Sequence, residues 1–219
     1  MTRMKAVYQG QRMLPEEKNA LEALEKVLGN PIPSVGFINT FVFGFIAIDN
    51  HVSTLGIPNK GLVTLPELFG KLSFLEECML FSNQLKTLPK SSGDLKSLKF
   101  LNLVNNKLNS LPESFMHLKS LQFLFLNRNK LEILPESFGR LTSLRRLNLR
   151  DNQLKTLPKS FLELPNLEML WIQNNPLDDD AKKILKQLQE QGVNIDIVDP
   201  ESEQVLTKIK EFIKAKNKN

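Results

Sequence analysis

The stretch LPESFMHLKSLQFLFLNRNKLEI, residues 111–133, contains four large apolar side chains in succession: Phe123, Leu124, Phe125 and Leu126. Side chains alternate between the two faces of a β-strand, so Leu124 and Leu126 share one face and Phe123 and Phe125 share the other. Both faces of this strand are therefore apolar. The surroundings of the strand decide what each face does.

The spacing of this stretch recurs along the chain. Copies of a 23-residue unit begin at Leu65, Leu88, Leu111, Leu134 and Leu157. Each copy follows the pattern L-x-x-L-x-L-x-x-N-x-L, with Cys78 or Ile172 at a leucine position in two of them. A weaker copy, VSTLGIPNKGLVTLP at residues 52–66, carries Lys60 in place of the asparagine. One unit of this kind cannot bury its leucines alone, so we expect neighbouring units to stack around a continuous core.

The repeat resembles that of the intracellular leucine-rich repeat proteins, in which the return segment reads L-P-x-S-F-x-x-L. Ras-suppressor and plant intracellular Ras-group proteins, and bacterial and archaeal leucine-rich repeat proteins, are similar over residues 52–176. The resemblance implies an α/β solenoid of about six repeats with a curved parallel sheet on its concave side. It also implies a protein partner, with a small GTPase or a signalling protein as a reasonable class.

Two other columns of residues recur once per repeat. An asparagine follows each strand, where its amide can satisfy backbone groups of the turn, and this predicts a structural ladder of Asn83, Asn106, Asn129, Asn152 and Asn175. A phenylalanine in the return segment predicts a buried spine of Phe69, Phe115, Phe138 and Phe161, with Ser92 as a gap. Cys78 occupies a leucine position of the pattern, so we expect a buried small hydrophobe.

A solenoid needs a cap at each end. The sequence predicts an N-terminal cap over residues 1–51, with a helix at 15–28 and a hairpin strand at about 39–48. The second strand of that hairpin is expected to begin the sheet of the solenoid.

Residues 177–219 are predicted to form a C-terminal cap with two helices and a short strand. Asp178–Asp180 precede the first helix, where negative charge is favourable, and we prefer this interpretation to a metal site. The last helix has one apolar side and a basic end. We expect it to pack back on the cap, and docking to a partner or to an anionic surface is the alternative.

The alternating strand positions are expected on the concave surface, because the leucines point into the core. Soluble proteins rarely leave a contiguous apolar patch uncovered, and aromatic residues, Met and Arg are enriched in protein interfaces. The predicted partner-binding residues are Met79, Phe81, Phe100, Val104, Phe123, Phe125, Arg128, Arg146, Arg150, Met169 and Trp171. The alternative is that cross-strand stacking alone explains the aromatic residues on this face.

Composition narrows the function classes. The net charge of +5 does not by itself indicate nucleic acid, and no phosphate-binding G-x-x-x-x-G-K-[ST] loop occurs. His51 and His117 belong to distant segments, and Cys78 is the only cysteine, so we predict no catalytic residues, no metal site and no cofactor. The start of the chain lacks the apolar core of a signal peptide and the interrupted run at 32–48 cannot span a membrane, so we expect a cytoplasmic protein.

These observations predict a non-enzymatic scaffold that binds another protein through its concave face, as a monomer or a weak homo-oligomer. Three alternatives stay open. The arginine flank could bind an anionic ligand or nucleic acid, although the sequence does not favour nucleic acid. The aromatic patch could join two copies of the chain, or the chain could target a separate catalytic subunit.

Overall fold

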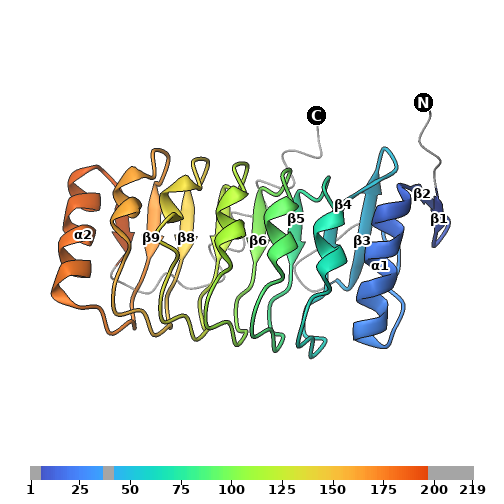
Figure 1. Ribbon diagram of the computed structural model, residues 1–219, viewed down its shortest axis with the longest axis horizontal. Helices are drawn as coiled ribbons and strands as arrows, with labels where there is room; N and C mark the ends of the chain where they lie inside the picture. Colours follow the sequence, from blue (N-terminus) through green and yellow to red (C-terminus); the bar gives the residue numbers. More distant parts are fainter. Residues whose placement is uncertain (1–5, 37–41, 197–219) are drawn as a thin grey trace.

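The computed structural model describes residues 6–36 and 42–196. Within these residues, eight strands form one sheet in the order β10-β9-β8-β7-β6-β5-β4-β3, which runs the length of the molecule (Figure 1). The strands are β3 (Gly44–Ile48), β4 (His51–Gly56), β5 (Glu77–Met79), β6 (Phe100–Asn102), β7 (Phe123–Phe125), β8 (Arg146–Asn148), β9 (Met169–Trp171) and β10 (Asn194–Asp196). Neighbours from β4 to β10 are parallel, and β3 and β4 are antiparallel. The predicted α/β solenoid is confirmed.

The leucine side of the sheet is the core of the molecule. In each strand the middle residue points inward, as Leu101, Leu124 and Leu147 do, and all three are buried in one continuous cluster. Cys78 occupies the same column and is fully buried, as predicted. Because each strand contributes few residues, its stability comes from stacking on the next repeat.

The return segments form 3₁₀ helices in front of the sheet (Figure 1). They are η1 (Glu67–Lys71), η2 (Lys90–Asp94), η3 (Glu113–His117), η4 (Phe138–Arg140) and η5 (Lys159–Glu163). Phe69, Phe115, Phe138 and Phe161 are buried between these helices and the strands, which confirms the predicted spine. Neighbouring turns pack so closely that a Cβ on Gly93 would lie 2.1 Å from the Ser114 carbonyl oxygen.

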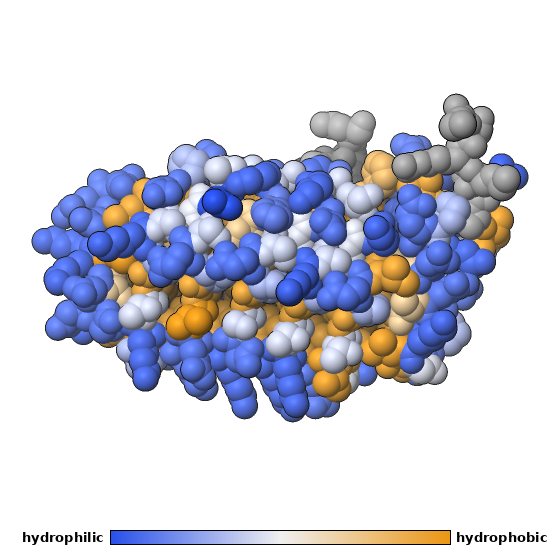
Figure 2. Space-filling view, viewed as in Figure 1, coloured by the Kyte–Doolittle hydropathy of each residue, from blue (hydrophilic) through white to orange (hydrophobic). Residues whose placement is uncertain are grey.

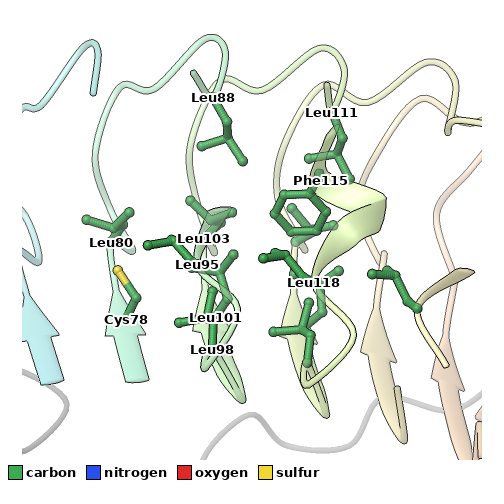
Figure 3. Packing of buried hydrophobic residues seen from close by; sticks show 14 of the residues in the cluster. Cys78, Leu80, Leu88, Leu95, Leu98, Leu101, Leu103, Leu111, Phe115 and Leu118 are labelled. Atoms are coloured by element: carbon green, nitrogen blue, oxygen red, sulfur yellow. The ribbon is translucent and has the colours of Figure 1, made fainter. Parts of the chain in front are cut away.

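Ser92 replaces the phenylalanine of the spine in the second of these turns. A small cavity of about 10 Å³ lies there, lined by leucines and by Phe69 and Phe115, and Figure 3 shows several of these leucines around Phe115. The Ser92 hydroxyl is buried in the described part of the chain without a hydrogen-bond partner. The smaller side chain thus leaves both a void and an unsatisfied polar group.

The asparagine ladder closes the turn after each strand. The Asn129 amide nitrogen donates to the carbonyl oxygens of Leu103 and Leu126, both at 2.9 Å, and its Oδ1 accepts from the Leu108 N–H at 3.0 Å. One side chain therefore ties two successive repeats together. Asn83, Asn106, Asn152 and Asn175 make equivalent bonds.

The N-terminal end is covered by helix α1 (Pro15–Leu28), which lies beside the first repeat (Figure 1). Its Glu17 is fully buried and accepts hydrogen bonds from the Val52 N–H at 3.1 Å and from the Leu14 N–H at 3.4 Å. Burial raises the pKa of Glu17 above its usual range, and these bonds act in the opposite direction. A buried carboxyl thus joins α1 to the start of the sheet.

A hairpin of β1 (Ala6–Tyr8) and β2 (Gln11–Met13) precedes α1, and the sequence analysis did not predict it. Gln9 and Gly10 have φ values of 49° and 76°, the left-handed backbone that two-residue hairpin turns need. The Tyr8 hydroxyl donates to the Glu25 carboxylate, which also accepts from the Ile32 N–H at 2.7 Å. The hairpin is thereby held against α1.

The first strand of the second hairpin was predicted at about residues 39–48, but β3 begins at Gly44. Residues 37–41 lie outside the described part. The Phe45 N–H donates to the Pro33 carbonyl at 3.0 Å, and a Cβ on Gly44 would lie 2.7 Å from that oxygen. Gly44, with φ of 154°, therefore sets where the strand can begin.

The C-terminal end carries helix α2 (Asp179–Glu190), followed by β10. The Asp178 carboxylate accepts from the Ala181 N–H at 2.8 Å, and Asp179 and Asp180 pair with Lys182 and Lys183. These contacts support the helix-capping interpretation of the three aspartates. The second predicted C-terminal helix lies outside the described residues.

Candidate functional site: the concave face of the sheet

The side of the sheet opposite the leucine core carries the predicted site. The register pairs Phe100 with Phe123 and Asn102 with Phe125, so the alternating positions align across the strands. One column holds Thr54, Glu77, Phe100, Phe123, Arg146 and Met169, and the next holds Gly56, Met79, Asn102, Phe125, Asn148 and Trp171. The register that the repeat predicts is confirmed.

Five of these residues form a second hydrophobic cluster, separate from the leucine core. This cluster, here called the aromatic cluster, consists of Met79, Phe100, Phe123, Phe125 and Trp171. The Phe100 ring lies 6.5 Å from the Phe123 ring and 5.6 Å from the Phe125 ring, between centroids, and both pairs are tilted. Such geometry stabilises aromatic pairs beyond the area that they bury. Phe81, Val104 and Met169 are half-buried and pack against the cluster.

The sequence analysis expected this face to be exposed to solvent, and that expectation is wrong for the aromatic cluster. Phe123 is 9% exposed and Trp171 is 3% exposed. The side chains of the cluster bury one another by mutual packing. Side chains of the N-terminal segment also cover part of the cluster, which the sequence did not indicate. Val35, Val42 and Ile46 pack against the cluster.

The alternation of side chains in β3 could have indicated that Ile46 covers the aromatic cluster. The β3–β4 register pairs Ile46 with Thr54, which places Ile46 in the same column as Phe100 and Phe123. The alternation in GFIAI would have assigned Phe45 to the core and Ile46 to the concave face, if the register of the hairpin had been known. Phe45 is indeed fully buried.

Two asparagines separate the apolar side chains in the second column. The Asn102 Oδ1 accepts from the Val104 N–H at 3.1 Å, and the Asn148 Oδ1 accepts from the Arg150 N–H at 3.1 Å. Their carbonyl groups are thus satisfied by backbone groups just beyond their own strands. The indole N–H of Trp171, by contrast, is buried without a hydrogen-bond partner in the part of the chain that the structure describes.

Three arginines flank the aromatic cluster toward its C-terminal end. The Arg146 guanidinium lies over the Phe123 ring at 5.8 Å from the centroid, a distance at which a cation is attracted to the ring. Arg128 and Arg150 both approach Asp151, at 3.8 and 3.7 Å. Asp151, which the sequence analysis did not include, therefore offsets part of the positive charge of this flank.

Arg128 also has an unusual backbone. The third residue after each strand from β4 to β9 has positive φ, between 52° and 59°. This column consists of Asn59, Ser82, Asn105, Arg128, Asp151 and Asn174. Asn and Asp tolerate the left-handed conformation well, whereas a long side chain gains nothing from it. The Arg128 side chain is 66% exposed, so packing does not require it there.

The groups that could support catalysis lie apart. Burial raises the pKa of the Cys78 thiol well above its usual range, so the thiolate needed for attack is disfavoured. His51 stacks on Phe74 near the N-terminal end, and His117 is exposed in η3. Within residues 6–36 and 42–196, no group of three or more His, Cys, Asp or Glu side chains could hold a metal ion.

Comparisons with known proteins agree with this architecture. A family model described as a leucine-rich repeat region matches residues 90–193. The chain has the leucine-rich repeat fold. No curated protein matches the chain. Across the described residues, we find no helix with the length and apolar character needed to cross a membrane.

Two solved structures illustrate the similarity. A chain from the octameric complex of Latrophilin 3, Unc5D and FLRT2, in which FLRT2 is the leucine-rich repeat component, is 26% identical with a TM-score of 0.57. The match covers 68% of this chain and 49% of that one. A leucine-rich repeat protein of Leptospira interrogans is 27% identical with a TM-score of 0.38, over 66% of this chain and 54% of that one. The chain thus spans about half the length of the structures it matches.

Proposed function

We propose that the protein is an interaction scaffold that binds another protein on its concave face. The observation that carries this proposal is the aromatic cluster, which the solenoid does not need for its own core. Met79, Phe100, Phe123, Phe125 and Trp171 form it on the far side of the strands from the leucines. Aromatic residues in a desolvated centre are the residues that dominate binding energy in protein interfaces.

The flank indicates the chemistry of the partner. Arg146 and Arg150 border the cluster, and Arg128 holds a left-handed backbone that its own side chain does not favour. Strained residues cluster at functional positions, which supports a role for Arg128 in recognition. The expected partner segment therefore carries an apolar anchor followed by acidic residues, which can pair with guanidinium groups.

Rigid presentation of these groups favours binding. Each strand is fixed by its neighbours and by the asparagine ladder, so few rotatable groups need to be ordered when a partner docks. A similar repeat chain in the octameric complex with Latrophilin 3 and Unc5D is part of a protein assembly, which supports a role in protein binding. The resemblance to Ras-group proteins makes a small GTPase the first partner class to test.

Affinity capture from a lysate of the source cells tests the proposal. The wild type is compared with a Phe100→Ala/Phe123→Ala/Phe125→Ala variant, and a Val63→Ala/Leu68→Ala/Ile133→Ala variant is the control. The control removes apolar groups that are exposed and lie outside the strands of the sheet. The surface in Figure 2 is mainly hydrophilic, with apolar atoms in a band along the molecule. Circular dichroism first establishes that all three proteins fold alike.

We expect the wild type and the control to retain the same protein, and the aromatic variant to lose it, because hot-spot residues cost about 2 kcal/mol or more each when truncated. Equal retention by all three proteins would contradict the proposal. A retained species that is released steeply with added salt would indicate an anionic ligand or nucleic acid on the arginine flank. A mass that increases with protein concentration would indicate self-association.

A further inference from the structure

Trp171 lies near the C-terminal end of the aromatic cluster, on β9, and is 3% exposed. Val35, Val42 and Ile46 pack on the cluster from outside β4–β9 and belong to the segment around β3, at the opposite end of the sheet. These three residues therefore approach the cluster from the end that lies far from Trp171.

The course of the chain brings a candidate to this place. Strand β10 pairs in parallel with β9, and its last residue, Asp196, is paired in register with Trp171. The remaining 23 residues, 197–219, therefore begin next to Trp171, one strand spacing of about 4.8 Å away.

The sequence of this remainder matches an amphipathic helix. Val205, Leu206, Ile209, Phe212 and Ile213 follow the spacing i, i+1, i+4, i+7, i+8, which places them on one side of a helix. A helix over residues 201–213 is about 20 Å long at 1.5 Å per residue. The four strand spacings from β9 to β5 cover about 19 Å, so such a helix spans the aromatic cluster from Trp171 to Met79.

The charges run in complementary directions. In the segment, Asp199, Glu201 and Glu203 come first, and Lys208, Lys210, Lys214, Lys216 and Lys218 follow. On the concave face, Arg146 on β8 and Arg150 just beyond it lie near β9, and Glu77 lies on β5. A helix that leaves β10 and crosses toward β5 places its acidic start beside the arginines and its basic end beside the glutamate.

We propose that residues 201–213 dock as an amphipathic helix on the aromatic cluster of the same chain and occupy the groove that a partner would use. The competition with a partner rests on the proposed function, whereas the docking itself does not. Binding of a partner then requires displacement of this segment, so the apparent affinity for the partner is the intrinsic affinity multiplied by the undocked fraction.

Trp171 is the only tryptophan, so its fluorescence reports directly on the groove in the full chain. The test variant is Ile209→Asp/Phe212→Asp, which places two charges in the apolar stripe. The control variant is Gln204→Asp/Thr207→Asp, which adds the same two charges on the other side of the helix. Acrylamide quenching and the emission maximum are measured for the wild type and for both variants.

We expect low quenching and blue-shifted emission for the wild type and the control, and severalfold greater quenching with a red shift for Ile209→Asp/Phe212→Asp. A synthetic peptide of residues 199–219 added to the latter variant should restore the shielding. Equal quenching in all three proteins would overturn the docking, because the segment would then lie on the cap or elsewhere. Shielding of the wild type that disappears on dilution would also overturn it, since the segment of a second copy would then be the occupant.

Affinity capture separates this inference from the proposed function. If Ile209→Asp/Phe212→Asp exposes Trp171 and retains more partner than the wild type, docking and competition both hold. If it exposes Trp171 and no protein is retained, docking holds and the proposed function fails. If partner capture depends on the aromatic cluster while Trp171 is unaffected by the variant, the function holds and the docking is wrong.

Discussion

The two faces of the same strands differ in how strictly their residues repeat. On the core side the column contains Leu55, Cys78, Leu101, Leu124, Leu147 and Leu170, and each is buried. On the concave side the neighbouring column passes from Glu77 through Phe100 and Phe123 to Arg146. Stacking restricts the first column to apolar side chains that can be fully buried, and it places no such restriction on the second. Concave positions can therefore vary without loss of the fold, and their side chains can determine which partner binds.

The largest effect is expected where one side chain joins two repeats. Asn129→Ala should lower the free energy of unfolding by about 4 kcal/mol. The Leu108 N–H is left buried without its partner, at about 1–3 kcal/mol, and the carbonyl oxygens of Leu103 and Leu126 each lose one of the hydrogen bonds that they accept, at about 1 kcal/mol each. Chemical denaturation measures the loss. Asn109→Ala, which changes an exposed asparagine without a left-handed backbone, is the control. A loss below about 1 kcal/mol would show that the ladder is dispensable.

Adjacent residues on β7 allow the two faces to be compared directly. Leu124→Ala should cost about 3 kcal/mol of unfolding free energy, because it opens a cavity in the core. Phe123→Ala should cost less, about 1–2 kcal/mol, because its ring lies in the aromatic cluster and not in the leucine core. Partner binding should change in the opposite order, with the greater loss for Phe123→Ala. The contrast between the faces breaks down if Phe123→Ala is the more destabilising variant.

A smaller and stabilising effect is expected at the gap in the phenylalanine spine. Ser92→Ala removes a buried hydroxyl that has no hydrogen-bond partner in the described residues, so the free energy of unfolding should rise by about 1 kcal/mol. Thermal unfolding detects such a change. Ser110→Ala, at an exposed position, should change stability little. Destabilisation by Ser92→Ala would mean that the hydroxyl is satisfied, by ordered water for example.

The smallest effect on stability should come from the concave flank. Arg128→Asn replaces the long side chain at positive φ with the residue found at Asn105 and Asn174, and stability should rise by up to about 1 kcal/mol. Partner affinity should fall at the same time, because a guanidinium group is lost from the rim. Lys130→Asn, two residues further along, removes an exposed charge outside this column and serves as the control. Unchanged affinity would remove Arg128 from the site.

Regular features of the chain were predictable because they repeat. The register that pairs Phe100 with Phe123 and the asparagine ladder follow from the repeat, and the single helix at Pro15–Leu28 follows from its own end signals and apolar spacing. Other features that occur once were not predictable, because no local pattern marks them. The β1–β2 hairpin and the late start of β3 at Gly44 depend on single contacts, with Glu25 and Pro33, that lie far away in sequence or outside any periodic pattern.

The sequence by itself determined the solenoid, the inward column of leucines and the presence of aromatic residues on the opposite face, because a period of 23 residues can bury its leucines in only one way. Tertiary structure alone decided how that opposite face is used. It brought Val35, Val42 and Ile46 onto the aromatic cluster and placed the end of β10 beside Trp171. These are contacts between segments that share no repeat, so no spacing in the sequence records them.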